Sequence, residues 1–449
     1  MDSEHSSIQK GISRLDFVKA SSATAGGLML SSLPTAKSAY AAGSGKIKVA
    51  LVGCGGRGTG AAFNALATGE DIQLVAMADA FRDRLDNSFD QLGGRYGDSE
   101  QLNVPDEHKF VGLDAYKHAT DLADVVLEAA PPGFRPAHFN YAVEQGKHIF
   151  MEKPVATDAP GVRRILASGE IAREKGLNVV VGLHKRYRNS YREALKRLHN
   201  REIGDIISGQ IYFNMGDLWV RERQPDQTEL EYQIRNWYHF VWTCGDHIVE
   251  QHVHNIDAAN WFLGEYPATA QGMGGREVRT GKEYPQIFDH HFVEYTYPSG
   301  VVIASQCRQI PGCYNREGEA FQATRGFLNM DENDNTVIRD RNKNIRYVHD
   351  GEDDPAPHQQ EIDELFESIR RGNIIDNTEY GAKSTHAGIM GRMATYSGQV
   401  IEWDDALNHG RRHVPDDIGW DITPPVEPDE NRRYPIAVPG EAEVFERPV

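Results

Sequence analysis

The chain contains little cysteine, and its few cysteines are scattered. Cysteine occupies only positions 54, 244, 307 and 313 of 449, which excludes a small scaffold held together by disulfides. None of the spacings between them is that of a zinc ribbon. A bridge between Cys307 and Cys313 is conceivable, but we expect both to be buried free thiols.

Basic side chains are scarce relative to acidic ones, and long apolar runs are missing. The 48 lysines and arginines are outnumbered by 66 aspartates and glutamates, which gives a net charge of −18. A chain of this sign repels nucleic acid and anionic membrane surfaces, so neither is an expected partner. The longest apolar candidate, 20–33, contains two glycines and several serines and is too short to anchor in a bilayer.

That apolar run lies in a segment, 1–41, whose composition differs from the rest of the chain. Lys10 and Arg14 precede the run, and Ala39-Tyr40-Ala41 offers a small-x-small cleavage site, which together predict an export signal over 1–41. Residues 13–19 are similar to a twin-arginine signal, with Leu15 where the second arginine belongs. We therefore expect a periplasmic protein, or a cytoplasmic one if the altered signal does not function.

Glycine, by contrast, is abundant, and one cluster of it directly follows an apolar strand. Residues 47–52 lead into Gly53-x-Gly55-x-x-Gly58, the pattern of a dinucleotide-binding turn. In that pattern the first glycine permits a tight turn, the second lets the backbone approach a pyrophosphate, and the third lets the next helix pack closely. An apolar-patterned helix and a second strand, 72–78, follow as the pattern requires.

Asp79 ends that second strand and predicts the choice of nucleotide. It lies 26 residues after Gly53, near the position of a carboxylate that hydrogen-bonds a ribose hydroxyl. Because such a carboxylate repels a 2′-phosphate, we expect NAD rather than NADP. Arg82 nearby leaves some tolerance for NADP, and the alternative is that Asp79 only caps the next helix.

The pattern along the chain predicts two α/β domains after the export signal. From 46 to 184, apolar strands alternate with helices, which is typical of a parallel sheet covered on both faces; the strands are expected at 47–52, 72–78, 125–129, 148–151 and 178–181, with a surface loop over 90–109. From 185 to 403 we expect a helix at 190–198, alternating strands at 206–213, 292–297 and 301–306, a turn at 297–300, and helices around 362–369 and 379–400. The tail, 404–449, is rich in proline, aspartate and arginine, and we interpret it as an extended arm.

Two further motifs identify a family. The first is Gly146-Lys147-His148-Ile149-Phe150-Met151-Glu152-Lys153-Pro154, and the second runs from Gly245 to Asp257 and is followed by Trp261-Phe262-Leu263-Gly264. With the glycine turn, they make 46–403 similar to the Gfo/Idh/MocA family of glucose-fructose oxidoreductase and inositol dehydrogenase. The resemblance implies a Rossmann domain over 46–184 and an α/β domain with an open, mainly antiparallel sheet over 185–403. It also implies sugar, polyol or cyclitol substrates, and dimers or tetramers joined through the open sheet.

The resemblance places the chemistry on three residues. Lys153 corresponds to the family's lysine beside nicotinamide and substrate, and Glu250 and His254 to its acid and histidine. Glutamate stands where many relatives carry aspartate. Residues four apart share a helix face, so Glu250, His254 and then Asp257 are expected to form one stripe, with the carboxylate raising the pKa of the imidazole. We expect His254 to take the hydroxyl proton and Lys153 to stabilise the developing alkoxide.

Further residues are assigned to each ligand. The predicted cofactor-binding residues are Gly53, Gly55, Gly56, Arg57, Gly58, Asp79, Arg82, Pro131, Glu152 and Lys153. The predicted substrate-binding residues are Lys153, His184, Lys185, Tyr187, Arg235, Trp237, His254 and Asp257. His184 or Tyr187 is a candidate for an additional acid or base, while Trp237 and Trp242 have an alternative role as core residues.

A metal site is an alternative role for part of this motif. His247, Glu250 and His254 could converge as ligands, but their spacing differs from the His-Glu-x-x-His pattern, and the resemblance gives the same residues a metal-free role. We therefore expect no metal, and we expect His252 to be a structural histidine.

Three functions remain open from the sequence. The leading one is an NAD-dependent oxidoreductase that removes hydride from a hydroxyl-bearing carbon of a sugar, cyclitol or sugar derivative. The alternative is a redox-neutral glycoside hydrolase in which bound NAD oxidises the sugar, elimination and hydration follow, and the sugar is reduced again. The third is a nucleotide-binding sensor without catalysis, which would leave the three motif residues without a purpose.

Overall fold

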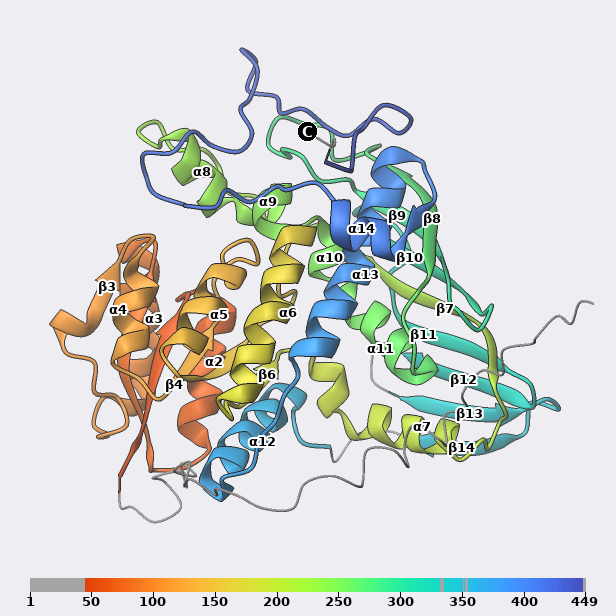
Figure 1. Cartoon of the computed structure of the whole chain (residues 1–449), viewed down its shortest axis with the longest axis horizontal. Helices are drawn as coiled ribbons and strands as arrows, with labels where there is room; N and C mark the ends of the chain where they lie inside the picture. Colours follow the sequence, from red (N-terminus) through yellow and green to blue (C-terminus); the bar gives the residue numbers. More distant parts are fainter. Residues whose placement is uncertain (1–44, 332–334, 350, 352–353, 447–449) are drawn as a thin grey trace, which may run out of the picture.

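The computed structural model describes residues 45–331, 335–349, 351 and 354–446. The predicted export signal, 1–41, lies outside the described residues. Figure 1 shows two sheets side by side, with helices between them. Among the described residues, none of the helices combines the length and the apolar character needed to cross a bilayer.

The N-terminal half forms a parallel sheet of six strands in the order β3-β2-β1-β4-β5-β6. Its strands are β1 (Ile47–Val52), β2 (Ile72–Asp79), β3 (Lys109–Val111), β4 (Val125–Glu128), β5 (His148–Met151) and β6 (Val179–Val181). The helices that connect them are α2 (Gly56–Ala67), α3 (Arg82–Tyr96), α4 (Ala115–Asp121), α5 (Arg135–Glu144) and α6 (Ala159–Glu174). Strands buried on both faces explain the continuous apolar runs seen in the sequence.

One segment of this half differs from the prediction. The loop expected over 90–109 is in part the second half of α3, which continues to Tyr96, and Lys109 begins β3. Leu85, Leu92 and Tyr96 bury one stripe of α3, while most of its other positions are polar. The polar composition therefore marks the exposed face of a helix rather than a loop.

The second sheet has nine strands in the order β14-β13-β12-β11-β7-β10-β9-β8-β15. They are β7 (Ile206–Met215), β8 (Thr269–Gly275), β9 (His290–Thr296), β10 (Val302–Gln309), β11 (Arg316–Ala323), β12 (Gly326–Asp331), β13 (Thr336–Asp340), β14 (Ile345–His349) and β15 (Ile401–Glu402). Only β7 and β10 pair in parallel, so the sheet is mainly antiparallel, as predicted. The predicted turn joins β9 to β10, with the N–H of Gly300 donating to the carbonyl of Tyr297 at 2.8 Å.

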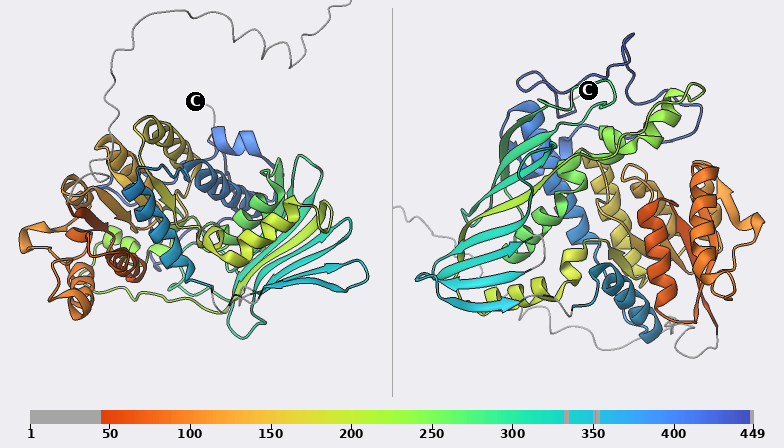
Figure 2. Two further views of the ribbon diagram at one scale, coloured as in Figure 1. Left: turned by 90° about the horizontal axis from the view of Figure 1, so that it is seen from below. Right: turned by 180° about the vertical axis from the view of Figure 1, so that it is seen from behind.

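Helices fill the space between the sheets, as Figure 2 shows from two further sides. They include α7 (Asn189–His199), α11 (Val253–Leu263), α12 (Pro357–Arg371) and the buried α13 (Thr378–Ser397). Although α12 lies late in the chain, it packs on α2, and Arg370 pairs with Asp71 at 2.7 Å. Helix α12 therefore packs on the N-terminal domain, although it lies within 185–403, the predicted second domain.

The C-terminal tail packs on its own chain. It begins with a short helix, α14 (Trp403–His409), where an extended arm was expected from 404. The chain then runs without regular structure over α8 (Glu229–Arg235) and α9 (Val241–Cys244). Tyr434 is buried there against Phe240, with ring centroids 4.9 Å apart, and Trp420 lies 5.7 Å from Phe81.

Candidate active site

The glycine turn between β1 and α2 is shaped by close backbone approach on one side and open space on the other. Gly53 has a φ of 89°, and a Cβ there would lie 2.4 Å from the backbone nitrogen of Ala130. A Cβ at Gly58 would lie 1.9 Å from the carbonyl oxygen of Gly53. At Gly55 and Gly56 a Cβ would meet nothing within 4 Å. The turn therefore leaves exposed backbone at the start of α2, where N–H groups hold phosphates.

A cavity of about 640 Å³ begins at this turn and runs between the two halves of the molecule. Its walls come from the carboxyl ends of the parallel strands, from the segment after β7, from α8 and its following turn, and from residues 250–254. Ligands of parallel α/β sheets bind at this edge, where the strand order reverses. The cavity thus lies where the glycine pattern predicted a nucleotide.

Asp79 lines the end of the cavity at β2. Its two carboxylate oxygens accept hydrogen bonds from the backbone N–H groups of Cys54 at 2.7 Å and Phe81 at 2.9 Å. Burial raises the pKa of Asp79 above its usual value, while these two donors act in the opposite direction. The carboxylate is therefore held in a fixed orientation beside the glycine turn.

The arginine at this end of the cavity is Arg84 and not the predicted Arg82. The side chain of Arg82 is 56% exposed and lies 3.6 Å from Asp86. Arg84 lines the cavity together with Arg221. Two residues along a helix turn the side chain by about 200°, so the prediction chose the outward-facing position.

Arg57 and Glu152, both predicted cofactor contacts, pair with each other at the cavity wall. Arg57 Nε lies 2.5 Å from Glu152, and a second guanidinium nitrogen lies 3.3 Å from Glu361 of α12. Burial alone would raise the pKa of Glu152, but the charges of Arg57, Lys153 and Arg135 lower it. Burial raises the pKa of Glu361 to about 7. These pairs tie α12 to the nucleotide half beside the cavity.

Lys153 and Glu250 meet at the opposite end from Asp79. Lys153 Nζ donates to the backbone carbonyl of Glu250 at 2.6 Å and lies 3.2 Å from its Oε1. The other carboxylate oxygen of Glu250, Oε2, is buried and has no hydrogen-bond partner among the described residues. The two contacts therefore fix the ammonium of Lys153 beside Glu250.

His254 lies beside this pair and belongs to a group of three imidazoles. Its ring centroid is 4.3 Å from that of His184, which in turn is 4.7 Å from that of His358 in α12. Nδ1 of His254 and Nδ1 of His184 are buried without a partner among the described residues. All three histidines line the cavity.

The expected effect of Glu250 on His254 is wrong. Burial lowers the pKa of His254 well below its usual value, and His184 and Lys153 lower it further. Glu250 directs its carboxylate to Lys153, so it does not raise the pKa of the imidazole. Burial likewise lowers the pKa of His184 well below its usual value. Both rings are neutral at physiological pH.

The motif that supplies Glu250 and His254 is not one continuous helix. It forms α10 (His247–Glu250) and α11 (Val253–Leu263), separated by Gln251 and His252. Both predicted catalytic residues still face the cavity, but the stripe does not continue to Asp257. The side chain of Asp257 forms a two-bond ion pair with Arg186, at 2.8 Å for each contact, and is a structural residue.

Lys185 and Tyr187 also lie behind the cavity wall rather than in it. Lys185 Nζ lies 3.0 Å from Glu319 and 3.3 Å from Glu317, and only Glu317 lines the cavity. The hydroxyl of Tyr187 donates to Asn377 Oδ1 at 2.8 Å within the core. In the sequence these residues neighbour His184, but a short 3-10 helix, η3 (His184–Tyr187), directs them away.

The remaining predicted residues line the cavity at different places. Pro131 and Trp237 contribute directly to its wall. Arg235 does so beside Phe81, 3.8 Å from the ring centroid, and pairs with Asp83 at 2.9 Å, which places it at the Asp79 end. Trp242 is a core residue that is 2% exposed and donates to Gln233.

Several lining residues were not foreseen from the sequence. They are chiefly His358, Glu317, Arg84, Arg221 and Trp219. His358 stands at the start of α12, about a hundred residues after the recognised motifs, and only the packing of α12 on α2 brings it to His184. In the sequence, a polar residue in the first turn of an amphipathic helix does not indicate that it lines a cavity.

Outside the cavity, the described residues include one group with the composition and spacing of metal ligands, Asp246, His247 and His291. It differs from the candidate set in the sequence, His247, Glu250 and His254, because Asp246 and His291 stand in place of Glu250 and His254. His252 is buried and contacts Ser305 Oγ at 2.7 Å, as expected of a structural histidine. The four cysteines are free, and Cys313 is exposed rather than buried.

Two family models match the chain. One, described as an oxidoreductase family with an NAD-binding Rossmann fold, matches residues 47–183. The other, described as the C-terminal alpha/beta domain of the same family, matches residues 196–378. Together they cover both halves of the cavity wall.

Curated relatives are similar over part of their length. The chain is 24% identical over 245 residues to an inositol 2-dehydrogenase of Rhizobium meliloti, covering 54% of this chain and 63% of that protein. It is 25% identical over 182 residues to a 2,7-anhydro-N-acetylneuraminate hydratase of Escherichia coli, covering 40% and 45%. The chain thus spans about half the length of these relatives.

Solved structures show the same fold at low identity. An aldose-aldose oxidoreductase from Caulobacter crescentus has a TM-score of 0.62 at 18% identity, covering 80% of this chain and 99% of that one. A levoglucosan dehydrogenase in complex with NADH and levoglucosan has a TM-score of 0.63 at 16% identity, with the same coverage. From the two matched models and the shared fold, the chain belongs to the Gfo/Idh/MocA oxidoreductase family.

Proposed function

We propose that the protein is an NAD-dependent oxidoreductase that acts on a hydroxyl group of a sugar, cyclitol or sugar derivative. The observation that carries the proposal is the grouping of Lys153, Glu250 and His254 at one end of a cavity whose other end holds Asp79 and the glycine turn. NAD bound along this cavity would accept hydride from the substrate carbon. The open space at Gly55 and Gly56 fits its diphosphate.

The protein side chains then handle the proton and the charge. Burial lowers the pKa of His254 and so favours its neutral form, and its imidazole, which lines the cavity, can accept the hydroxyl proton. Lys153 remains near the same oxygen and stabilises negative charge as the proton leaves. Glu250 holds Lys153 through two contacts, one from its backbone carbonyl and one from Oε1.

Recognition of a carbohydrate is supported by the aromatic wall of the cavity. Trp219 and Trp237 line it with ring centroids 5.9 Å apart, and aromatic faces pack well on the C–H face of a sugar. The preference for NAD over NADP rests on Asp79. The nearby Arg84 and Arg221 act against that preference, because a guanidinium can pair with a 2′-phosphate.

A redox-neutral reaction is the second candidate, and His184 favours it. Oxidation followed by elimination and hydration needs an acid or base in addition to His254, and His184, whose pKa is lowered by burial, lies beside His254 and lines the cavity. A relative named as a hydratase adds support. Export through the predicted signal over 1–41 would also favour it, since retained NAD needs no external supply.

One experiment separates these functions. Purified protein is heated to release bound nucleotide, and native protein is assayed with NAD against free sugars, cyclitols and aryl glycosides. Accumulating NADH supports the dehydrogenase, whereas release of the aryl group with retained, stoichiometric NAD supports the redox-neutral reaction. Lack of both signals across the panel, with no nucleotide bound, would contradict an enzyme of either kind.

A further inference from the structure

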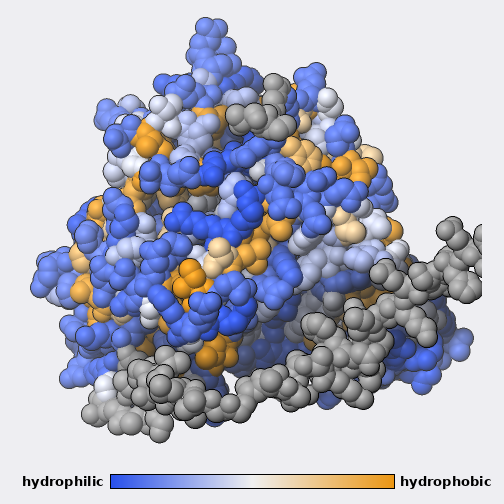
Figure 3. Space-filling model, in the orientation of Figure 1, coloured by the Kyte–Doolittle hydropathy of each residue, from blue (hydrophilic) through white to orange (hydrophobic). Residues whose placement is uncertain are grey.

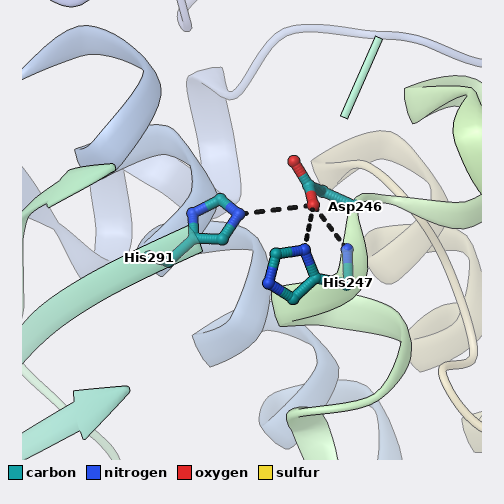
Figure 4. A group of neighbouring side chains, drawn as sticks. All are labelled: Asp246, His247 and His291. Carbon is teal, nitrogen blue, oxygen red and sulfur yellow. Dashed lines mark hydrogen bonds and ion pairs between the residues drawn. The ribbon is translucent and has the colours of Figure 1, made fainter. Parts of the chain in front are cut away.

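A second polar cluster lies outside the cavity, at the start of α10. It consists of Asp246, His247 and His291, and Figure 4 shows both imidazole rings turned towards the carboxylate. His247 Nδ1 lies 3.0 Å and His291 Nε2 lies 3.3 Å from Asp246 Oδ1, and all three side chains are 0% exposed. The proposed function leaves this cluster without a role.

Asp246 satisfies this cluster only in part. His247 Nδ1 and His291 Nε2 lie at ion-pair distance from the same oxygen, Asp246 Oδ1, but are poorly aligned for hydrogen bonds, and His247 Nε2 is buried without a partner among the described residues. Oδ1 also accepts from the backbone N–H of His247 at 2.5 Å. Leaving imidazole nitrogens poorly paired in the interior is costly, so the arrangement calls for a group that satisfies them.

The atoms of His291 and Asp246 that face away from the cluster are, by contrast, fixed by hydrogen bonds. His291 Nδ1 contacts Thr395 Oγ1 at 2.9 Å, which leaves Nε2 facing Asp246. Asp246 Oδ2 accepts from the hydroxyl of Tyr396 at 2.5 Å and from the N–H of Phe288 at 3.0 Å, which leaves Oδ1 facing the rings. Such outer contacts orient histidine and carboxylate ligands in metal sites. Asp246 also has a positive φ of 77°, unusual outside glycine.

We propose that Asp246, His247 and His291 bind one divalent transition-metal ion, with zinc as the best match. Two imidazole nitrogens and one carboxylate oxygen are its common ligands, at bond lengths of about 2.0–2.2 Å. In a tetrahedral site such bonds separate the ligand atoms by about 3.3 Å, close to the two separations in the cluster. Softer thiolate-binding ions and hard oxygen-binding ions such as Mg²⁺ fit this donor set less well.

The bound ion has a structural role in this arrangement. His247 begins α10 and Glu250 ends it, so an ion shared with His291 joins α10 to β9 and fixes the helix whose last residue holds Lys153. The ion is shielded from the cavity, because none of its three ligands lines it. Metal binding therefore does not depend on the proposed reaction and is tested without an activity assay.

The test begins with the metal content of the full chain. Protein without an affinity tag is treated with a chelator, dialysed against micromolar Zn²⁺ and then against metal-free buffer, and analysed by mass spectrometry. We expect about one zinc per chain, a fall in the melting temperature with chelator and its recovery with Zn²⁺. Loading with Co²⁺ instead should give the visible absorption of a tetrahedral site.

Variants locate the ion. His291→Gln should lower zinc content at least tenfold, whereas His290→Ala, the next residue on β9 with a side chain 44% exposed, should retain it. If His291→Gln does not fold, anomalous diffraction at the zinc edge from the native protein should place a peak between the three side chains. Zinc below about 0.1 per chain with an unchanged melting temperature, or full retention in folded His291→Gln, would overturn the proposal.

Discussion

Lys153 offers the simplest test at the scale of a single residue, because both of its contacts are with Glu250. Lys153→Met keeps most of the aliphatic stem and removes the ammonium. We expect kcat to fall by about 10² to 10⁴, with NAD affinity changed by less than about threefold, because the diphosphate site lies at the glycine turn. Kinetics and calorimetry measure the two quantities.

Lys117→Met provides the control, since Lys117 is a half-exposed lysine that pairs with Asp114 and does not line the cavity. It should leave both quantities unchanged. A Lys153→Met variant with more than a tenth of the native kcat would exclude a role for this ammonium in the reaction.

The pH dependence of the reaction follows from His254. Its pKa is lowered by burial, and a base must be unprotonated to accept a proton. The acid limb of kcat/KM for oxidation should therefore lie below pH 6.5, the ordinary value for histidine. Since the unfolded chain takes up this proton at about 6.5 and the folded chain does not, stability should also fall as pH drops below that value. An acid limb centred at pH 7 or above would contradict a buried neutral base.

Among the helices, replacing a glycine by alanine should have opposite effects on stability in α2 and in α3. A Cβ at Gly58 would meet the carbonyl of Gly53 at 1.9 Å, whereas a Cβ at Gly94 would meet nothing within 4 Å. We expect Gly58→Ala to destabilise the protein by about 3 kcal/mol because α2 must move away from the turn. Gly94→Ala should instead stabilise it by about 0.5–1 kcal/mol through helix propensity.

Urea denaturation and NAD titration measure both glycine variants. Gly58→Ala should also weaken NAD binding at least tenfold, and Gly94→Ala should not. Equal stability and equal NAD affinity for the two variants would show that the close approach at Gly58 is unimportant.

The elements of the nucleotide half could be predicted because each carries a local pattern. Strands buried on both faces appear as short apolar runs, so the expected bounds of β1 and β5 match the structure. The break between α10 and α11 could not be predicted, because Gln251 and His252 are compatible with a helix. Asp257 follows His254 on α11 but pairs with Arg186 instead of lining the cavity, so the expected stripe was one residue too long.

At the scale of the whole molecule, residues that meet only through folding escaped prediction. His358 and Glu317 reach the cavity from α12 and β11, and neither lies in a motif. Lys185 was assigned to the substrate because it neighbours His184, yet it forms a buried pair with Glu319. Sequence spacing therefore predicted that Lys153, Glu250 and His254 lie at one cavity, but it did not predict the residues that form the rest of its wall.

The visible face of the molecule in Figure 3 is largely hydrophilic, with apolar areas between polar ones. The C-terminal tail is attached to the rest of the molecule by Tyr434, which packs into an apolar cluster with Phe240. Tyr434→Ala should reduce the free energy that holds the tail in place by about 3 kcal/mol, because a buried aromatic side chain is lost. Tryptic cleavage beside it, at Arg432 and Arg433, should therefore become at least ten times faster. Tyr314→Ala is the control, because Tyr314 is 81% exposed, and it should cleave at the native rate. Unchanged cleavage of Tyr434→Ala would mean that the tail is held elsewhere.

The central claim is that one cavity holds a dinucleotide from Asp79 to Lys153 and His254. A crystal structure with NADH and a polyol substrate from the panel tests it most directly. We expect a ribose at Asp79, the diphosphate over Gly55 and Gly56, and the nicotinamide ring beside Lys153 and His254, with the substrate oxygen between them. A nicotinamide ring at the Asp79 end, or a dinucleotide bound outside this cavity, would contradict it.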